Sequence, residues 1–238
     1  MFTGFLQLAS QDIRKISDTK QHRLGAVGVT RDGRVYRYTK AGGSTLAPGK
    51  LSVAATVDAN VTNKTVARTY AAGSRQVIID AGGAITANAY ADGYLTINDA
   101  TGEGVSSSVV GNSATSGAAE LTVDLDESIP VALTIDVSEA SLTKNPWGDT
   151  VISVTDQADM PVGIPNVSIT NAYYGWTQTR GVCSALADEA ITAGLALTTG
   201  TGVAGAVEAL DAAGEPQIGV AIVAGVDTEY REVFLTID

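Results

Sequence analysis

Tyr173-Tyr174-Gly175-Trp176-Thr177-Gln178-Thr179 begins a series of short β-rich runs that fill the last third of the chain. The later runs cover residues 183–186, 194–198, 206–210, 217–221 and 230–237, with glycine-containing turns between them. Runs of about 5–6 residues at this spacing are typical of a small barrel or sandwich and not of helices. Residues 173–238 are therefore predicted to form a C-terminal β-barrel-like module.

A β-hairpin is predicted near the start of the chain. Asp32-Gly33 separates two β-rich runs, which is a strong hairpin signal. Alternate residues of a strand share a face, so Tyr36 and Tyr38 are expected on one face and Val35 and Arg37 on the other. Further strands are predicted at residues 51–57, 65–70, 76–79, 94–97, 104–110, 119–125 and 129–135.

These strands predict an all-β protein with two small barrel-like or sandwich-like modules and an extended N-terminal arm. The predicted bounds are 1–24 for the arm, 25–142 for the N-terminal module, 143–172 for an extended linker and 173–238 for the C-terminal module. Asn145-Pro146 and Gly148 interrupt the strand pattern, which places the module boundary just before them. The arm has apolar residues without a sustained period, so we expect it to be a frayed terminus or to become ordered only against a partner.

Charge is divided unevenly along the sequence. Of the 15 Lys and Arg residues, 12 lie before residue 76, together with only 4 of the 26 Asp and Glu residues. A basic segment on a chain whose net charge is −11 favours docking onto an acidic protein surface, including that of another copy. Nucleic acid is not expected as a partner, because no aromatic stacking platform accompanies the basic residues and the acidic remainder repels phosphate.

Candidate catalytic residues are few. His22 is the only histidine and Cys183 the only cysteine, which excludes a multi-histidine metal site and an internal disulfide. No sequence pattern pairs these two residues as base and nucleophile. We therefore expect no enzymatic activity, no catalytic residue, no metal site and no cofactor.

Two acidic segments allow a second interpretation. Asp124, Asp126 and Glu127 suggest a carboxylate pair for hydrolysis, but the alternation of apolar and polar residues in 119–125 predicts a solvated acidic face. The loop from Asn98 to Glu103 offers oxygen ligands of the kind that bind calcium, without the EF-hand spacing. Both a plain turn and an ion site are consistent with that loop.

The sequence gives no indication of a membrane segment. No run approaches the roughly 18 apolar residues of a membrane span, and the N-terminus lacks the cationic region of an export signal. We expect a soluble chain that does not associate with membranes.

Several stretches resemble structural proteins of tailed bacteriophages. Leu24-Gly25-Ala26-Val27-Gly28 and the segment from Asp32 to Gly42 resemble the opening of such proteins. Residues 174–181, Ile191-Thr192-Ala193-Gly194, and the stretches 217–221 and 229–235 are similar to phage head decoration proteins. The middle of the chain contributes nothing to the resemblance.

The resemblance implies a non-enzymatic virion structural protein, a cement protein that decorates and stabilises a capsid by bridging neighbouring major capsid protein subunits. It implies homotrimers or dimers on the outer capsid surface, made in the cytoplasm of the bacterial host. Flat β faces and complementary charge suit such a partner better than a pocket does. The alternatives are a head-fibre base, a minor tail component, or a carbohydrate-binding β module that uses Tyr173, Tyr174 and Trp176 as an aromatic platform.

Two sets of contact residues follow from this interpretation. The basic segment is predicted to contact the shell through Phe2, Phe5, Arg14, Lys15, Arg23, Arg31, Arg34 and Arg37. Tyr174 and Trp176 are predicted to lie either in the core or at a contact between subunits.

Overall fold

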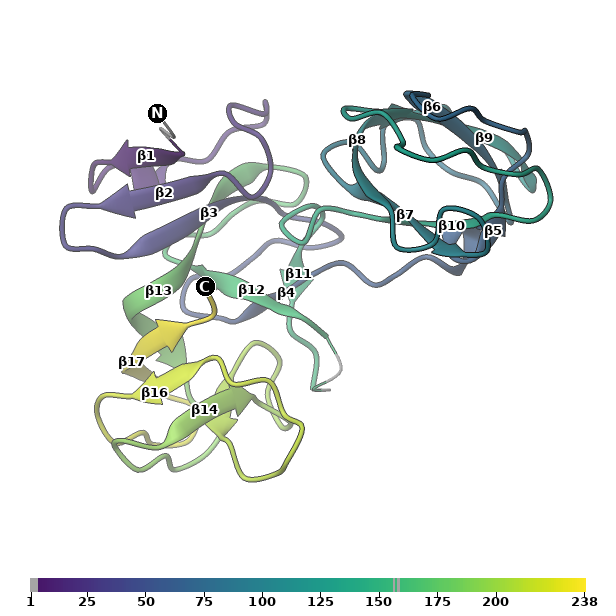
Figure 1. Ribbon diagram of the computed structural model, residues 1–238. Coiled ribbons are helices and arrows are strands. Elements are labelled where there is room, and N and C mark those ends of the chain that lie inside the picture. The colour runs from purple at the N-terminus through teal and green to yellow at the C-terminus, as the bar shows by residue number, and fades with distance from the viewer. Residues whose placement is uncertain (1–3, 156, 158) are drawn as a thin grey trace. The chain divides into compact units, whose positions relative to one another are not determined.

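The computed structural model describes residues 4–155, 157 and 159–238, and almost all of its regular structure is β (Figure 1). The all-β prediction is therefore confirmed. The helical segments, η1 Asp12–Arg14 and η2 Ala59–Val61, are short 3-10 turns. Among the described residues, no helix is long and apolar enough to cross a membrane.

The chain divides into two compact units whose bounds differ from the predicted ones. Unit 1 consists of Met1–Ala55 and Pro146–Asp238, and unit 2 of Thr56–Asn145. The predicted division at 142/143 separated segments that pair with one another, because partner strands in unit 1 lie more than a hundred residues apart in sequence. Unit 2 is an insertion into unit 1.

Unit 1 is built on one extended sheet. Its strands are β1 Phe5–Leu8, β2 Val27–Thr30, β3 Val35–Lys40, β4 Ser52–Val53, β11 Val151–Ile152, β12 Pro161–Pro165, β13 Tyr174–Leu186, β14 Ala196–Thr199, β15 Val207–Ala209, β16 Gly219–Ala221 and β17 Tyr230–Thr236. The main order is β1-β2-β3-β13-β17-β16-β14-β15, with β12, β4 and β11 branching from β13. The predicted Asp32-Gly33 hairpin joins β2 to β3. As predicted, Tyr36 and Tyr38 are buried on one face of β3.

The central strand β13 replaces two strands that the sequence predicted separately. Its first half pairs with β3, and its second half pairs with β17, so that β3 and β17 lie beside opposite ends of it (Figure 1). The register with β3 shifts between Gln178 and Arg180, and Gly181 has φ +89°. That backbone conformation is accessible to glycine at little cost, so β13 bends here without ending.

Gln178 fills the interior at this bend. Its side chain is fully buried, and its amide nitrogen donates to the carbonyl oxygens of Arg180 (3.0 Å) and Val182 (2.8 Å). Its Oε1 accepts from the hydroxyl of Tyr36 (3.1 Å), which in turn accepts from the side-chain amide of Asn166 (2.9 Å). Burial raises the pKa of Tyr36 to about 12, so this hydroxyl remains a donor at neutral pH.

Residues 4–24 do not form the predicted arm. β1 pairs in parallel with β2, from Phe5 opposite Val27 to Leu8 opposite Thr30. Leu8 and Ile13 are buried in one cluster with Trp176. A Cβ atom on Gly28 would overlap Leu8, so the glycine leaves the space that this side chain occupies. Leu8 and Ile13 are therefore core residues of unit 1, whereas Phe5 and Leu6 are exposed.

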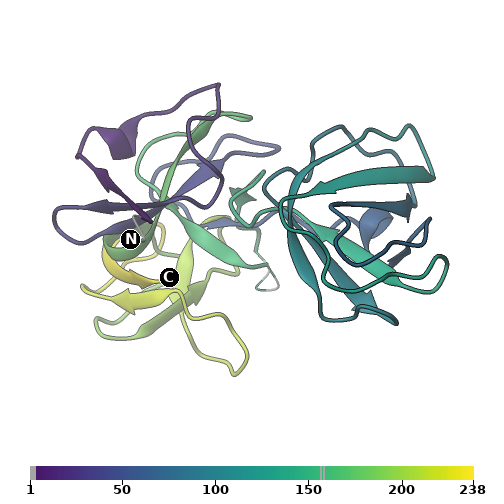
Figure 2. The same cartoon turned by 45° about the horizontal axis from the view of Figure 1, so that its top comes forward.

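Unit 2 is a nearly closed barrel of six strands (Figure 2). The strands are β5 Lys64–Thr65, β6 Gln76–Ala81, β7 Tyr94–Asp99, β8 Ser106–Asn112, β9 Ala119–Leu125 and β10 Glu139–Thr143, in the order β5-β10-β7-β8-β9-β6. An isolated bridge between Val66 and Ile79 brings the chain after β5 against β6. The two edges of the sheet therefore meet, which leaves little edge exposed.

The strand pattern of unit 2 was predicted in part. Leu121, Val123 and Leu125 are buried in its core, as the alternation in 119–125 predicted. The strand predicted at 129–135 is wrong. Pro130 lacks a donor N–H, and the segment makes only an isolated bridge through Leu133, while Ile129 and Leu133 enter the core. β10 follows it and was not predicted.

The insertion can be tested by separating the units. Residues 56–145 expressed alone are expected to fold, because their core is contained within the segment. A short glycine-serine linker in their place is expected to leave unit 1 folded, since β4 and β11 pair directly, with Val53 opposite Val151. Both tryptophans, Trp147 and Trp176, belong to unit 1, so their fluorescence reports its unfolding alone.

Each separated unit is expected to melt cooperatively, within about 5 °C of the corresponding transition in the intact chain. Circular dichroism follows the isolated unit 2. Loss of the cooperative transition in either fragment would contradict the division.

Candidate functional site

Trp176 lies in an aromatic cluster inside unit 1. Its ring centroid is 5.2 Å from that of Tyr38, and the ring of Tyr174 stacks parallel to Tyr38 at 5.9 Å. His22 meets Tyr38 edge to face at 5.1 Å. Trp176 is 4% exposed, which corresponds to the core alternative for this residue, while Tyr174 is partly buried at the margin of the cluster.

The three aromatic residues suggested as a carbohydrate platform do not share a surface. Tyr173 packs with Leu46 and Ile169 in a different cluster, because adjacent residues of an extended chain point to opposite sides. A hollow of about 540 Å³ lies beside Tyr174 and the covered edge of Trp176. The polar side chains that line this hollow include Lys15, which is already paired. The three rings therefore do not form one platform.

Several of the predicted shell-contact cations are paired within the chain. Lys15 binds Asp12 at 2.7 Å and Arg34 binds Asp32 at 2.8 Å. The hydrogen bond from Lys15 lowers the pKa of Asp12. The pKa of Asp32 is lowered as well, mainly by a hydrogen bond from the hydroxyl of Thr30. Each of these ion pairs stabilises a local turn, so a partner could bind Lys15 or Arg34 only by competing with that pair.

Arg37 is the most extensively bound of these cations. Its guanidinium holds both side-chain oxygens of Asp238, at 2.5 and 2.7 Å, and donates to the carbonyl of Gly25 at 2.9 Å. It also lies 4.8 Å from the ring centroid of Trp147, within cation–π range. The hydrogen bond from Arg37 lowers the pKa of Asp238. Arg37 is therefore a structural residue that links β3 to Asp238, which follows β17.

The remaining predicted contact residues are exposed. Phe5 on β1 is 71% exposed, and Arg23 is exposed as well. Arg14 and Arg31 are exposed, and neither forms an ion pair with any residue that the structure describes. Phe2 lies outside the described residues. The set of available contact residues is thus smaller than the sequence predicted.

β1 lies at the edge of the sheet and carries Phe5, whereas Arg14 lies in η1 and Arg31 directly follows β2. In the strand order of the described chain, β2 is the one neighbour of β1. The other side of an edge strand leaves backbone N–H and C=O groups available to a strand from another chain. Phe5 and Leu6, which is 36% exposed, add apolar surface to that edge.

Cys183 and His22 are not brought together as a catalytic pair. Cys183 is buried in β13, and burial raises the pKa of its thiol to about 12, which keeps it protonated at neutral pH. His22 lies against the aromatic cluster instead. Within the part of the chain that the structure describes, no three or more His, Cys, Asp or Glu side chains gather as a metal site.

The acidic segments of unit 2 are engaged in local hydrogen bonds. Asp124 accepts from the side chain of Gln76 at 2.8 Å, and Glu127 accepts from the backbone of Ser108 at 2.9 Å. Near the end of β7, the amide of Asn98 donates to Asn63 at 2.9 Å and its oxygen accepts from the hydroxyl of Ser141. In the turn that follows, the backbone N–H of Ala100 donates to the side chain of Asp99 at 2.6 Å.

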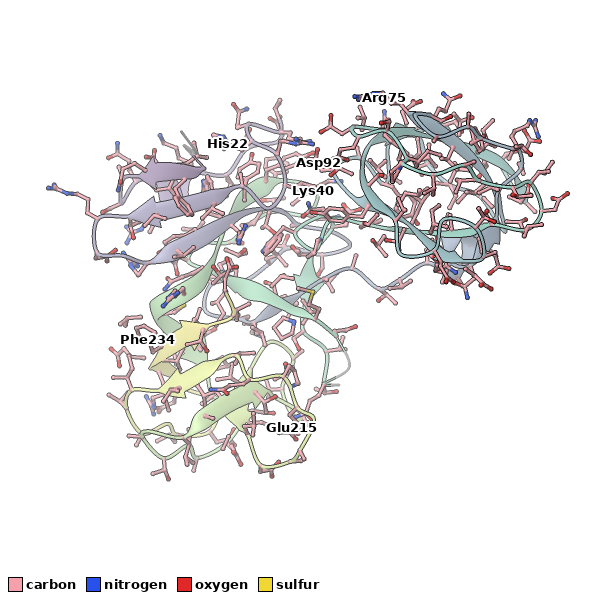
Figure 3. The ribbon with its side chains drawn as sticks, viewed as in Figure 1. His22, Lys40, Arg75, Asp92, Glu215 and Phe234 are labelled. Carbon is pink, nitrogen blue, oxygen red and sulfur yellow. The ribbon has the colours of Figure 1, made fainter. Side chains whose placement is uncertain are left out.

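The sequence prediction missed an exposed apolar pair on the sheet of unit 1. Val182 on β13 lies opposite Phe234 on β17, and the two side chains are 48% and 41% exposed. Phe234 is labelled in Figure 3. The alternation of the sequence contained this information. Val182 points to the same face of its strand as the charged Arg180, and Phe234 to the same face as the charged Glu232. Because the two side chains are cross-strand neighbours, they form an apolar patch, which marks a candidate contact surface.

The Arg37–Asp238 pair predicts a pH-dependent contribution to stability. Asp238→Asn is expected to lower the unfolding free energy of unit 1 by about 1 kcal/mol at about pH 7, because it removes a half-buried bidentate ion pair. The folded-state pKa of Asp238 is lower than that of an aspartate in the unfolded chain, which is about 3.9. The contribution is therefore present above that value and is lost as the pH falls through the folded-state pKa.

Urea denaturation followed by tryptophan fluorescence at a series of pH values measures this difference. Asp227→Asn, at an exposed aspartate of the same unit, is the matched control and is expected to change stability little. A difference for Asp238→Asn that persists at about pH 2, or none at about pH 7, would contradict the assignment.

Comparison with known proteins does not place this chain in a family. No family model matches the sequence, and no curated protein and no solved structure matches the chain. Its function therefore has to be argued from its own residues.

Proposed function

We propose that this protein is a non-enzymatic structural component of a tailed-phage virion, which decorates the outer surface of the capsid. In this role it stabilises the shell by bridging neighbouring major capsid protein subunits, and copies of the chain associate with one another. It is made in the cytoplasm of the bacterial host and acts on the assembled head.

The placement of the resembling stretches supports this proposal. Residues 24–42, 174–181, 217–221 and 229–235 are scattered along the sequence, yet they belong to β2, β3, β13, β16 and β17. These strands are connected neighbours in the sheet of unit 1. The resemblance thus concerns one continuous structure, and unit 2, which contributes nothing to it, is an insertion.

The observation that carries the proposal is the exposed edge of β1. Phe5 offers a large apolar side chain, and Arg14 and Arg31 offer cations without ion pairs in the described chain. Backbone pairing along β1 gives affinity, whereas the phenylalanine and the arginines give specificity for an acidic strand or loop. If the shell protein has such an acidic strand or loop at each subunit boundary, the rigid sheet of unit 1 would hold neighbouring shell subunits together.

Binding to heads tests the proposal. Purified protein is expected to co-sediment with phage heads that lack it, and cryo-EM is expected to place it on the shell. Phe5→Glu and Arg31→Glu are each expected to weaken binding by about 10–100-fold, because both replace a favourable contact by an acidic group. Deletion of residues 1–24 is unsuitable, since Leu8 and Ile13 are core residues.

Val110→Glu in unit 2 is the matched control, because Val110 is 58% exposed and the change in charge is the same as in Phe5→Glu. Its binding is expected to equal that of the unmodified chain. Absence from the shell, or location on a tail or fibre, would contradict capsid decoration. Equal binding by all three variants would contradict the assignment to the edge of β1.

A further inference from the structure

A row of apolar side chains crosses the solvent face of the unit 1 sheet. Val182 on β13 lies opposite Phe234 on β17, Phe234 opposite Val220 on β16, and Val220 opposite Ala196 on β14. Adjacent strands are about 4.8 Å apart, so these four side chains are direct neighbours. The outer face of an antiparallel sheet is normally polar, which makes a continuous apolar row informative.

On β13 and β17 themselves the row is flanked by one charge on each side, and Arg14 of η1 lines a hollow together with Val182 and Glu232. Arg180 precedes Val182 in the same phase of β13, and Glu232 precedes Phe234 in the same phase of β17. Because the two strands are antiparallel, Arg180 lies on one side of the row and Glu232 on the other. Both side chains are exposed, and neither forms an ion pair with another described residue.

A hollow extends the row at its β13 end. It has a volume of about 420 Å³ and lies between Val182 and Phe234 on one side and the turn at Asp32-Gly33 on the other. Arg34, which also lines it, is held by Asp32 at 2.8 Å. Arg180 also lines this hollow, so an apolar side chain from outside that enters beside Phe234 lies close to that guanidinium.

We propose that this face binds the same face of a second copy of the chain around a two-fold axis that runs along the apolar row. Such an axis reverses the direction along the strands, so Arg180 of each copy meets the side of the row on which the other copy has Glu232. The two apolar rows then pack face to face at the usual sheet separation of about 10 Å. Both charges gain a partner, and the pairing is satisfied twice by symmetry.

Charge supports a second copy as the occupant. The chain has a net charge of −11, which opposes self-association over most surfaces. The exposed residues of β13 and β17 that flank the row include one cation and one anion, so two copies of this face do not repel each other. A strongly acidic or strongly basic partner would leave either Arg180 or Glu232 facing a like charge.

The inference rests on the proposed function, in which copies of the chain associate, and it names the surface by which they do so. Sedimentation equilibrium of the full purified chain, without any phage particle, tests it. A dimer with a Kd of about 1–10 µM is expected. Phe234→Glu is expected to raise this Kd at least about 30-fold, because it places two carboxylates at the centre of the interface. Val110→Glu is the control of equal charge and leaves the Kd unchanged.

Exchanging the charges of Arg180 and Glu232 distinguishes this two-fold arrangement from non-specific association. Arg180→Glu and Glu232→Arg are each expected to weaken the dimer about 10-fold, because each puts like charges opposite one another. The double variant Arg180→Glu/Glu232→Arg restores opposite charges and is expected to return the Kd to within about 3-fold of the original. Unchanged thermal unfolding of unit 1, followed by tryptophan fluorescence, shows that the variants are folded.

A chain that stays monomeric at about 100 µM, a dimer insensitive to Phe234→Glu, or a double variant no better than the single ones would overturn the inference. None of these outcomes affects binding to heads through β1. Conversely, a dimer that fails to bind heads contradicts capsid decoration and leaves the dimer face established.

Discussion

Gln178 occupies the point at which β13 exchanges β3 for β17 as its partner, and its buried amide hydrogen-bonds on both sides of the bend. A fully buried amide is costly unless its donors and acceptors are used. Here they bind two carbonyl groups of the strand itself and the hydroxyl of Tyr36. The rest of unit 1 depends on this constraint, because the strands before β13 and after it form one sheet only if β13 continues through the bend.

Folding also redistributes charge. Cations near the start of the chain form ion pairs with anions that follow much later in the sequence. In unit 1, Arg37 binds Asp238 and Lys40 binds Asp149. In unit 2, Arg68 binds Glu120. A sequence that is basic at one end and acidic over the remainder therefore does not fold into a basic arm on an acidic body. Among the exposed groups that remain, Phe5 on the edge strand β1, Arg31 after β2, and the row around Phe234 carry the proposals.

The sequence predicted what depends on local pattern. Strand alternation correctly placed Tyr36 and Tyr38 on one face, and the Asp-Gly turn correctly predicted the first hairpin. Prediction from the sequence failed where the structure of a segment depends on a partner that is distant in sequence. In the sequence, the segment from Gln178 to Gly181 resembles a break between two strands. In the structure β13 continues through it, because Gln178 hydrogen-bonds to Tyr36, which is far away in sequence. The division into units failed for the same reason, since β3 and β13 pair across an insertion that no local signal marks.

Substitution of Gln178 measures the central constraint most directly. Gln178→Ala is expected to lower the unfolding free energy of unit 1 by about 3 kcal/mol, because it leaves a cavity and unsatisfied buried polar groups. Urea denaturation followed by tryptophan fluorescence gives the value, and Gln217→Ala, at an exposed glutamine of the same unit, is expected to change it by less than about 0.5 kcal/mol. Equal stability of the two variants would contradict the account.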